Sequence, residues 1–135
     1  MAQSIMMLFM AGCFATADAE TTKAYVYPLK EGIYVQDGSD CRSAPNAAIR
    51  AYDGRGISDP HSRACRARII SKDGDRYTVD QSCLDAGAGP AKRVSERQTI
   101  IIADMTTFQL IQGRAKTKFR FCPESSLPDG ISPQR

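Results

Sequence analysis

The sequence predicts an all-β protein: a small antiparallel barrel or sandwich of about eight short strands, stapled by disulfide bonds. Beyond residues 1–19, no stretch repeats its apolar residues at the 3.6-residue period of an amphipathic helix. Short runs of β-branched and aromatic residues recur instead, separated by Gly, Asp, Asn and Pro. Four of the five cysteines lie in this β-rich part of the chain.

The chain begins with the pattern of a secretory signal peptide over residues 1–19. Residues 5–15 are an apolar run, and Ala17-Asp18-Ala19 has the small residues of a cleavage site. A bilayer span needs about 20 apolar residues, so this run is too short, and no second run of that length follows. We therefore expect a soluble periplasmic or secreted protein without a transmembrane segment.

Two other ways of processing the leader stay open. Cleavage after Ala17 would leave Asp18 at the front of the mature chain. The segment Met10-Ala11-Gly12-Cys13 is similar to a bacterial lipobox, which would make Cys13 a lipidated anchor. Met10 and Phe14 fit that box poorly, and we favour the soluble form.

The mature chain is expected to hold one β domain over residues 20–122, followed by a flexible tail over 123–135 that contains three prolines. Loss of the leader removes Cys13 and leaves an even number of cysteines, namely Cys41, Cys65, Cys83 and Cys122. In an exported chain this parity predicts two disulfides. The cysteines lack the close spacing of a zinc site and the chain has one His, so no metal or other cofactor is expected.

The strands are predicted from short apolar runs that end at turn residues. In chain order they cover residues 24–27, 32–35, 47–52, 64–72, 76–83, 97–103, 108–112 and 116–122. As an alternative, residues 46–51 begin a short helix. Residues 84–93 contain a glycine-rich connector and are predicted to form a loop.

The hairpin over residues 64–83 has the clearest local signal, because Gly74 accepts the positive φ of a tight turn. With a three-residue loop over 73–75, the opposed pairs are Lys72 with Arg76, Ile69 with Val79, Arg68 with Asp80 and Cys65 with Cys83. One face then holds Cys65, Ala67, Ile69, Tyr77, Val79 and Cys83, and the charged residues, Lys72 among them, lie on the other.

This register favours a Cys65–Cys83 bridge, which leaves Cys41 to pair with Cys122. A bridge directly across two strands is geometrically restrictive, so Cys41–Cys65 with Cys83–Cys122 stays an alternative.

The last strands differ in their patterns. Residues 100–102 are isoleucines and apolar on both faces, which predicts a central strand. In the final strand Phe119 and Phe121 are expected to point inward while Lys118 and Arg120 point outward. Lysines in such positions are typical of an exposed sheet edge.

Charge argues against a nucleic-acid partner. The net charge of +3 rises to about +4 without the leader, whose only charged side chain is Asp18. Acids and bases are interspersed, and the basic residues of 114–120 fall on alternate positions, as on the solvent face of a strand. No nucleic-acid stripe is predicted.

No enzymatic activity is predicted. His61 is the only histidine, and it lies in a loop rich in turn residues rather than beside a nucleophile on another element. Nucleophile elbows, phosphate loops and dinucleotide fingerprints do not occur in the sequence. The close carboxylate pairs lie in turns, where Asp is favoured for backbone reasons.

Binding is the better prediction, since loops on a rigid frame commonly carry recognition. The long loops cover 36–46, 53–63 and 84–93. The middle one combines both signs of charge with the directional donors of arginine. Its candidate binding residues are Asp53, Arg55, Asp59, His61 and Arg63.

In size, leader, hairpin pattern and the closing strand Phe119-Arg120-Phe121-Cys122, the chain resembles the small exported bacterial inhibitors of lysozymes and peptidoglycan hydrolases. The resemblance implies a compact barrel that inserts a loop into the cleft of a hydrolase partner. The positive net charge favours a neutral or acidic hydrolase over a strongly basic lysozyme. The alternative is an envelope domain that binds peptidoglycan or another envelope protein without inhibiting it.

Overall fold

The computed structural model describes residues 22–85, 87 and 89–131, so the expected signal peptide over 1–19 lies outside the described residues. The strands are β1 (Gly32–Gln36), β2 (Ile49–Tyr52), β3 (Ile57–Ser58), β4 (Ser62–Asp73), β5 (Arg76–Asp85), β6 (Arg93–Asp104), β7 (Thr107–Gln112) and β8 (Ala115–Cys122). They form one eight-stranded sheet in the order β3-β2-β1-β8-β7-β6-β5-β4. Every neighbouring pair is antiparallel.

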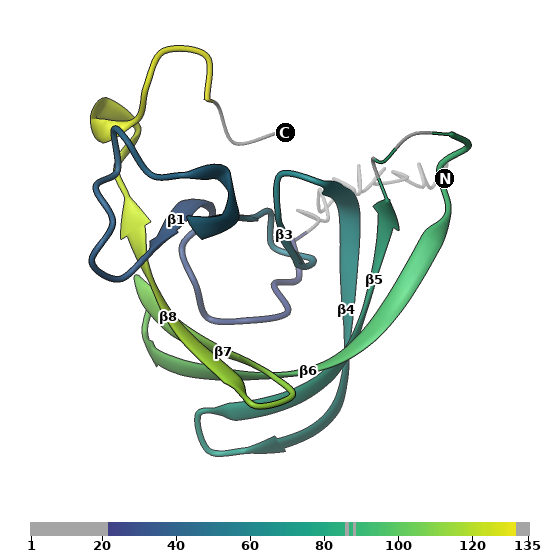
Figure 1. The fold of residues 1–135 in the computed structure, drawn as a ribbon. Coiled ribbons are helices and arrows are strands. Elements are labelled where there is room, and N and C mark those ends of the chain that lie inside the picture. Colours follow the sequence, from purple (N-terminus) through teal and green to yellow (C-terminus); the bar gives the residue numbers. More distant parts are fainter. Residues whose placement is uncertain (1–21, 86, 88, 132–135) are drawn as a thin grey trace, which may run out of the picture.

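The sheet curls until its two edge strands, β3 and β4, lie close together, which gives a nearly closed barrel (Figure 1). Two contacts make the seam. The amide of Ala67 donates to the carbonyl of Arg55 at 2.8 Å. The Gln81 side chain accepts from the Ile57 amide and donates to the Ile57 carbonyl, both at 2.8 Å. The predicted all-β, disulfide-stapled class is confirmed, and it takes the form of a barrel.

Aromatic side chains fill one end of the barrel. Tyr27 meets Tyr77 edge-on with ring centroids 5.4 Å apart, and Phe108 stacks on Phe119 at 5.2 Å. These rings are buried together with Tyr34, Tyr52, Val79, Ile100 and Ile102. The alternation of each strand aims these side chains inward, so the core follows directly from the sequence pattern.

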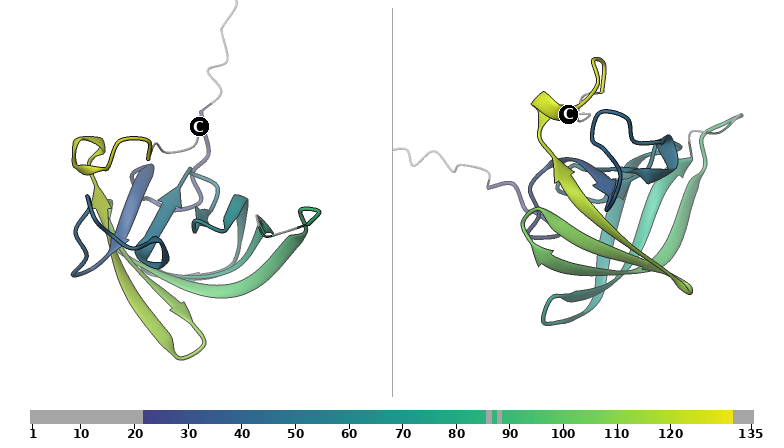
Figure 2. Two further views of the ribbon diagram at one scale, coloured as in Figure 1. Left: turned by 45° about the horizontal axis from the view of Figure 1, so that its top comes forward. Right: turned by 60° about the vertical axis from the view of Figure 1, so that its left-hand side comes forward.

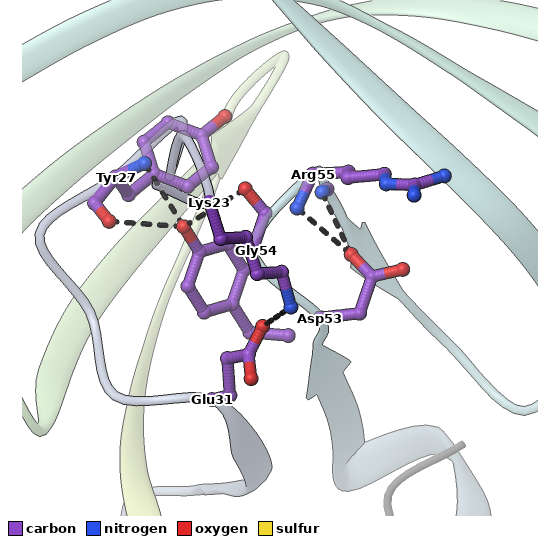
Figure 3. A network of polar contacts seen from close by, with 8 residues as sticks. Lys23, Tyr27, Glu31, Asp53, Gly54 and Arg55 are labelled. Atoms are coloured by element: carbon purple, nitrogen blue, oxygen red, sulfur yellow. Dashed lines mark hydrogen bonds and ion pairs between the residues drawn. The ribbon is translucent and has the colours of Figure 1, made fainter. Parts of the chain in front are cut away.

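The segment before β1 crosses this filled end instead of forming the strand predicted over 24–27, so that prediction is wrong. The Tyr27 amide donates to the Tyr52 hydroxyl at 3.0 Å, and that hydroxyl donates to the Tyr27 carbonyl at 2.9 Å (Figure 3). Burial raises the pKa of Tyr52 to about 12, which keeps it a donor. Pro28 follows at once and has no amide for a ladder. A tyrosine side chain therefore replaces the strand partner.

The β4–β5 hairpin confirms the predicted pairing of Ile69 with Val79 but corrects the turn. Asp73 pairs with Arg76 and Lys72 with Tyr77, and a register shift between Ile69 and Ser71 makes Ile70 an extra residue. This bulge moves Lys72 from the predicted outer face to a position where its Nζ lies 5.2 Å from the Tyr77 ring. Ile69 shares the inner face but stays 42% exposed, because β3 is too short to cover it.

Two further strand predictions need correction. β8 lies between β1 and β7, so it is not the edge that its lysines suggested. The two residues of β3 were missed, and the segment 46–52 divides into a 3-10 turn, η1 (Asn46–Ala48), and β2. The central position predicted for the isoleucine strand is confirmed, since β6 lies between β5 and β7.

The disulfides are Cys41–Cys122 and Cys65–Cys83, as the hairpin register predicted, and this pairing excludes the alternative. Cys122 belongs to a small second core on the outer face of β1, with Ile33 and Val35. Leu127, in the segment expected to be a flexible tail, is only 7% exposed in that core. The tail segment contains a 3-10 turn, η2 (Glu124–Ser126), and lies beside the loop between β1 and β2 (Figures 1 and 2).

The only helical elements in the described part of the chain are two three-residue 3-10 turns. Neither has the length or apolar character of a membrane span.

Candidate binding site at the barrel mouth

The other end of the barrel is lined by polar side chains. On β5, β6 and β7 the inward positions change from apolar residues to amides and a carboxylate. Val79 gives way to Gln81, Ile100 to Gln98 and then Glu96, and Leu110 to Gln112. The change occurs at the same level on β6 and β7, where Ile100 pairs with Leu110. On β5 it comes one inward position later, because Val79 pairs with Gln98 and Gln81 with Glu96. It leaves an open pocket of about 270 Å³, here called the mouth pocket.

The mouth pocket has an apolar wall and a polar rim. Its lining residues are Arg50, Ile57, Asp59, His61, Ser62, Gln81, Cys83, Asp85, Val94, Glu96, Gln98, Leu110 and Gln112. They come from β2, the strands β3 to β7 and the loop after β3. The Cys65–Cys83 bridge lies at its edge and ties β4 to β5 there. Mouths of β-barrels are a common place for ligand sites.

The carboxylate of Glu96 organises one side of the pocket. It accepts a hydrogen bond from Gln112 Nε2 at 3.0 Å and one from Gln98 Nε2 at 3.3 Å. Gln98 is buried and Glu96 is exposed, so the pair leads from the barrel interior to the rim. These bonds position the charge without neutralising it.

Arg50 lies on the opposite wall, on β2. Its Nη1 donates to the carbonyls of Ala47 at 3.0 Å and Ile49 at 2.7 Å, and its guanidinium carbon lies 5.0 Å from the centre of the Phe119 ring. Burial lowers the pKa of Arg50, and Asp59 opposes this shift. The group keeps its charge, because arginine titrates far above neutral pH.

The rim of the mouth pocket is acidic. Asp59, Asp85 and Glu96 contribute three carboxylates against the single guanidinium of Arg50, a formal charge of −2 with His61 counted as neutral. Asp59 Oδ1 accepts from the His61 amide at 2.8 Å, and Asp85 Oδ1 accepts from the Gly87 amide at 3.0 Å. These local bonds fix both carboxylates at the rim.

The five binding residues predicted from the sequence do not gather at one site. Asp59 and His61 line the mouth pocket, whereas Asp53, Asp59 and Arg63 line a separate groove of about 300 Å³ outside β2. Arg55 lines neither of these two pockets. Asp53 holds a turn, because its Oδ1 accepts from the amides of Arg55 at 2.9 Å and Gly56 at 3.2 Å (Figure 3).

Sequence reasoning missed five polar residues that line the pocket: Arg50, Gln81, Glu96, Gln98 and Gln112. A signal for three of them is visible in the chain. Gln81, Gln98 and Gln112 each follow or precede an apolar residue by two positions on the inner face of a strand. An amide in that position is inside the barrel and needs a partner there.

No known protein family, curated protein or solved structure matches the chain. Within residues 22–131, apart from 86 and 88, no three His, Cys, Asp or Glu side chains are grouped to hold a metal ion. Function is therefore inferred from the barrel and its mouth pocket.

Proposed function

We propose that the protein is an exported, non-enzymatic binding protein of the periplasm that inhibits a lysozyme or peptidoglycan hydrolase. Its two disulfides suit an oxidising compartment. They also hold a rigid frame, which limits the entropy lost when a partner is bound. The resemblance to small exported hydrolase inhibitors supplies the class of partner.

The observation that carries this proposal is the acidic rim above an apolar wall in the mouth pocket. Such a pocket fits a Lys or Arg side chain of the partner. The methylene stem would pack on Ile57 and Leu110, and the charged head would pair with the rim carboxylate of Glu96. A charge-assisted hydrogen bond to this carboxylate is stronger than one between neutral groups.

The charge of the whole chain narrows the choice of hydrolase. The mature chain carries about +4, which slows its encounter with a strongly basic lysozyme. The rim acts at short range, after the two surfaces have met. A neutral or acidic hydrolase that presents one basic side chain beside its cleft satisfies both conditions.

The direct test is inhibition of peptidoglycan hydrolysis. Purified mature chain is added to a panel of hydrolases that includes a basic lysozyme and neutral or acidic periplasmic enzymes. We expect inhibition at about micromolar concentration, an ordinary affinity for such a contact. The chain alone should release no fragments from peptidoglycan. Absence of inhibition across the panel contradicts the proposal.

The site is tested by Glu96→Gln, which removes the rim charge but keeps the shape of the side chain. We expect the inhibition constant to rise about tenfold, equivalent to about 1.4 kcal/mol. Glu124→Gln is the matched control, because Glu124 is exposed in η2 and does not line the mouth pocket. If both substitutions changed the inhibition constant equally, the contact with the hydrolase would lie outside the mouth pocket.

A further inference from the structure

The outer wall of the barrel carries a second cluster of charges, which the mouth pocket does not use. Pairing across β4, β5 and β6 places Arg68, Asp80 and Arg97 in one row and Arg66, Ser82 and Ser95 in the next. Arg93 lies one row further along β6. We call these seven residues the arginine face. Alternate residues of β5, namely Gln81 and Cys83, point to the mouth pocket, so the two surfaces lie on opposite sides of one sheet.

Asp80 orders two of the arginines. Arg97 Nε lies 2.8 Å from Asp80 Oδ1, and Arg68 Nη2 lies 2.9 Å from Asp80 Oδ2. The hydrogen bond from Arg97, with the charges of both arginines, holds the pKa of Asp80 below its usual value. One carboxylate therefore fixes two guanidiniums whose side chains are still 64% and 75% exposed.

Arg93 is fixed by a different set of acceptors. Its Nη1 donates to the carbonyl of Ser82 at 3.0 Å, to the Ser82 hydroxyl at 3.0 Å and to the Ala64 carbonyl at 3.2 Å. Arg66 is exposed and takes part in none of the ion pairs within the described residues. Neither guanidinium is neutralised by these contacts.

These side chains surround a shallow hollow of about 370 Å³, lined by Arg66, Ala67, Arg68, Asp80, Ser82, Arg93 and Ser95. With Arg97 beside it, four guanidiniums face one carboxylate, a formal charge of +3. Guanidinium and hydroxyl donors in this number are the chemistry that binds sulfate and carboxylate oxygens.

We propose that the arginine face binds a polyanionic glycan, a sugar chain with repeated sulfate or carboxylate groups. Arg66 and Arg68 lie two residues apart on β4, about 7 Å, and Arg93 and Arg97 lie four residues apart on β6, about 14 Å. The two strands flank β5, so their arginines form two lines about 10 Å apart. An extended chain of charges can follow these two lines. The two ordered rows contain Arg, Ser and Asp side chains only, whereas a protein interface has an apolar centre and a membrane surface site inserts apolar residues.

Heparin, a sulfated glycan, is the probe, and binding is measured by calorimetry and by the salt concentration that elutes the chain from a heparin column. We expect retention at about 0.15 M salt, where exposed charges are already screened beyond about 8 Å. The double variant Arg66→Gln, Arg93→Gln should weaken binding at least tenfold. The control, Arg42→Gln with Lys30→Gln, loses the same charge at exposed positions away from this face. It should change binding less than twofold.

Three results would overturn the proposal: no binding of heparin, equal weakening by the control pair, or binding to vesicles of one-quarter phosphatidylglycerol without binding to heparin. If the double variant fails to fold, Ser95→Asp adds a negative charge to the hollow while it leaves every arginine in place, and it should weaken binding likewise. Hydrolase inhibition should be unchanged in these variants, because the mouth pocket is intact. The two proposals can therefore fail separately.

Discussion

At the scale of single residues, Gln81 holds the most consequential position. β3 has only two residues, so the backbone amide and carbonyl of Ile57 that point across the seam need hydrogen-bond partners there. The Gln81 amide supplies both, since it donates from nitrogen and accepts at oxygen. An unpaired buried polar group costs about 1–3 kcal/mol, so loss of this one side chain would weaken the seam substantially.

Gln81→Glu should make the stability of the barrel depend on pH. An ionised carboxylate accepts from the Ile57 amide but repels its carbonyl, whereas the protonated acid restores both bonds. The pKa of the introduced carboxyl is thus raised in the folded state above about 4.3, its unfolded value. The folded state then binds the additional proton, so stability falls as pH rises through the raised pKa. Urea denaturation should show a loss of about 3 kcal/mol at pH 7 that shrinks toward pH 4.5.

Gln81→Met is the control for that prediction. It fills the same volume, makes neither bond and does not titrate, so its loss of about 2 kcal/mol should be the same at both pH values. If the free energy of unfolding of Gln81→Glu changed with pH no more than that of Gln81→Met, the seam would not depend on the Gln81 amide.

At the scale of elements, prediction succeeded for strands whose own residues show a clear apolar–polar alternation. The alternation in β4, β5 and β8 gives their inner faces, and Gly74 gives the hairpin. The bulge at Ile70 could not be predicted, because the sequence pattern there is compatible with either face of the strand. β3 could not be predicted because two residues are too few to show an alternation. Whether β8 is an edge depends on β1, a strand far away in sequence, and no local pattern contains that information.

The candidate site was harder to predict for the same reason. Loop residues such as Asp53 and Asp59 attract attention by their charge, yet their carboxylates accept bonds from nearby backbone amides. The amides of Gln98 and Gln112 look ordinary along the chain. They become a site only when pairing in register brings β6 and β7 together around Glu96.

The seam between β3 and β4 also makes a prediction at this scale. A Cβ on Gly56 would lie 2.7 Å from the Cys65 carbonyl carbon and 2.8 Å from its oxygen, both backbone atoms. Gly56→Ala must therefore push the two strands apart, at about 2–3 kcal/mol in the free energy of unfolding. Gly87→Ala is the control, since its Cβ meets only the Asp85 carboxylate at 3.3 Å. Similar denaturation midpoints for the two variants would contradict a close-packed seam.

At the scale of the whole molecule, the two disulfides have different tasks. Cys65–Cys83 joins neighbouring strands at the mouth pocket, over a sequence separation of 18 residues. Cys41–Cys122 spans 81 residues and fastens the loop after β1 to the end of β8, over the second core. The barrel core is built by the strands and the segment before β1, whereas a disulfide holds the loop that covers the second core.

Removal of each bridge should separate these tasks. Chain entropy predicts a loss of about 4.5 kcal/mol for Cys41→Ala with Cys122→Ala and about 3 kcal/mol for Cys65→Ala with Cys83→Ala. Denaturation should therefore rank the first pair as the less stable. Inhibition of a hydrolase should show the reverse order, because Cys83 lines the mouth pocket and Cys41 does not. If the Cys41–Cys122 variant, measured where it is still folded, lost inhibition first, the binding surface would include the loop between β1 and β2 rather than the mouth alone.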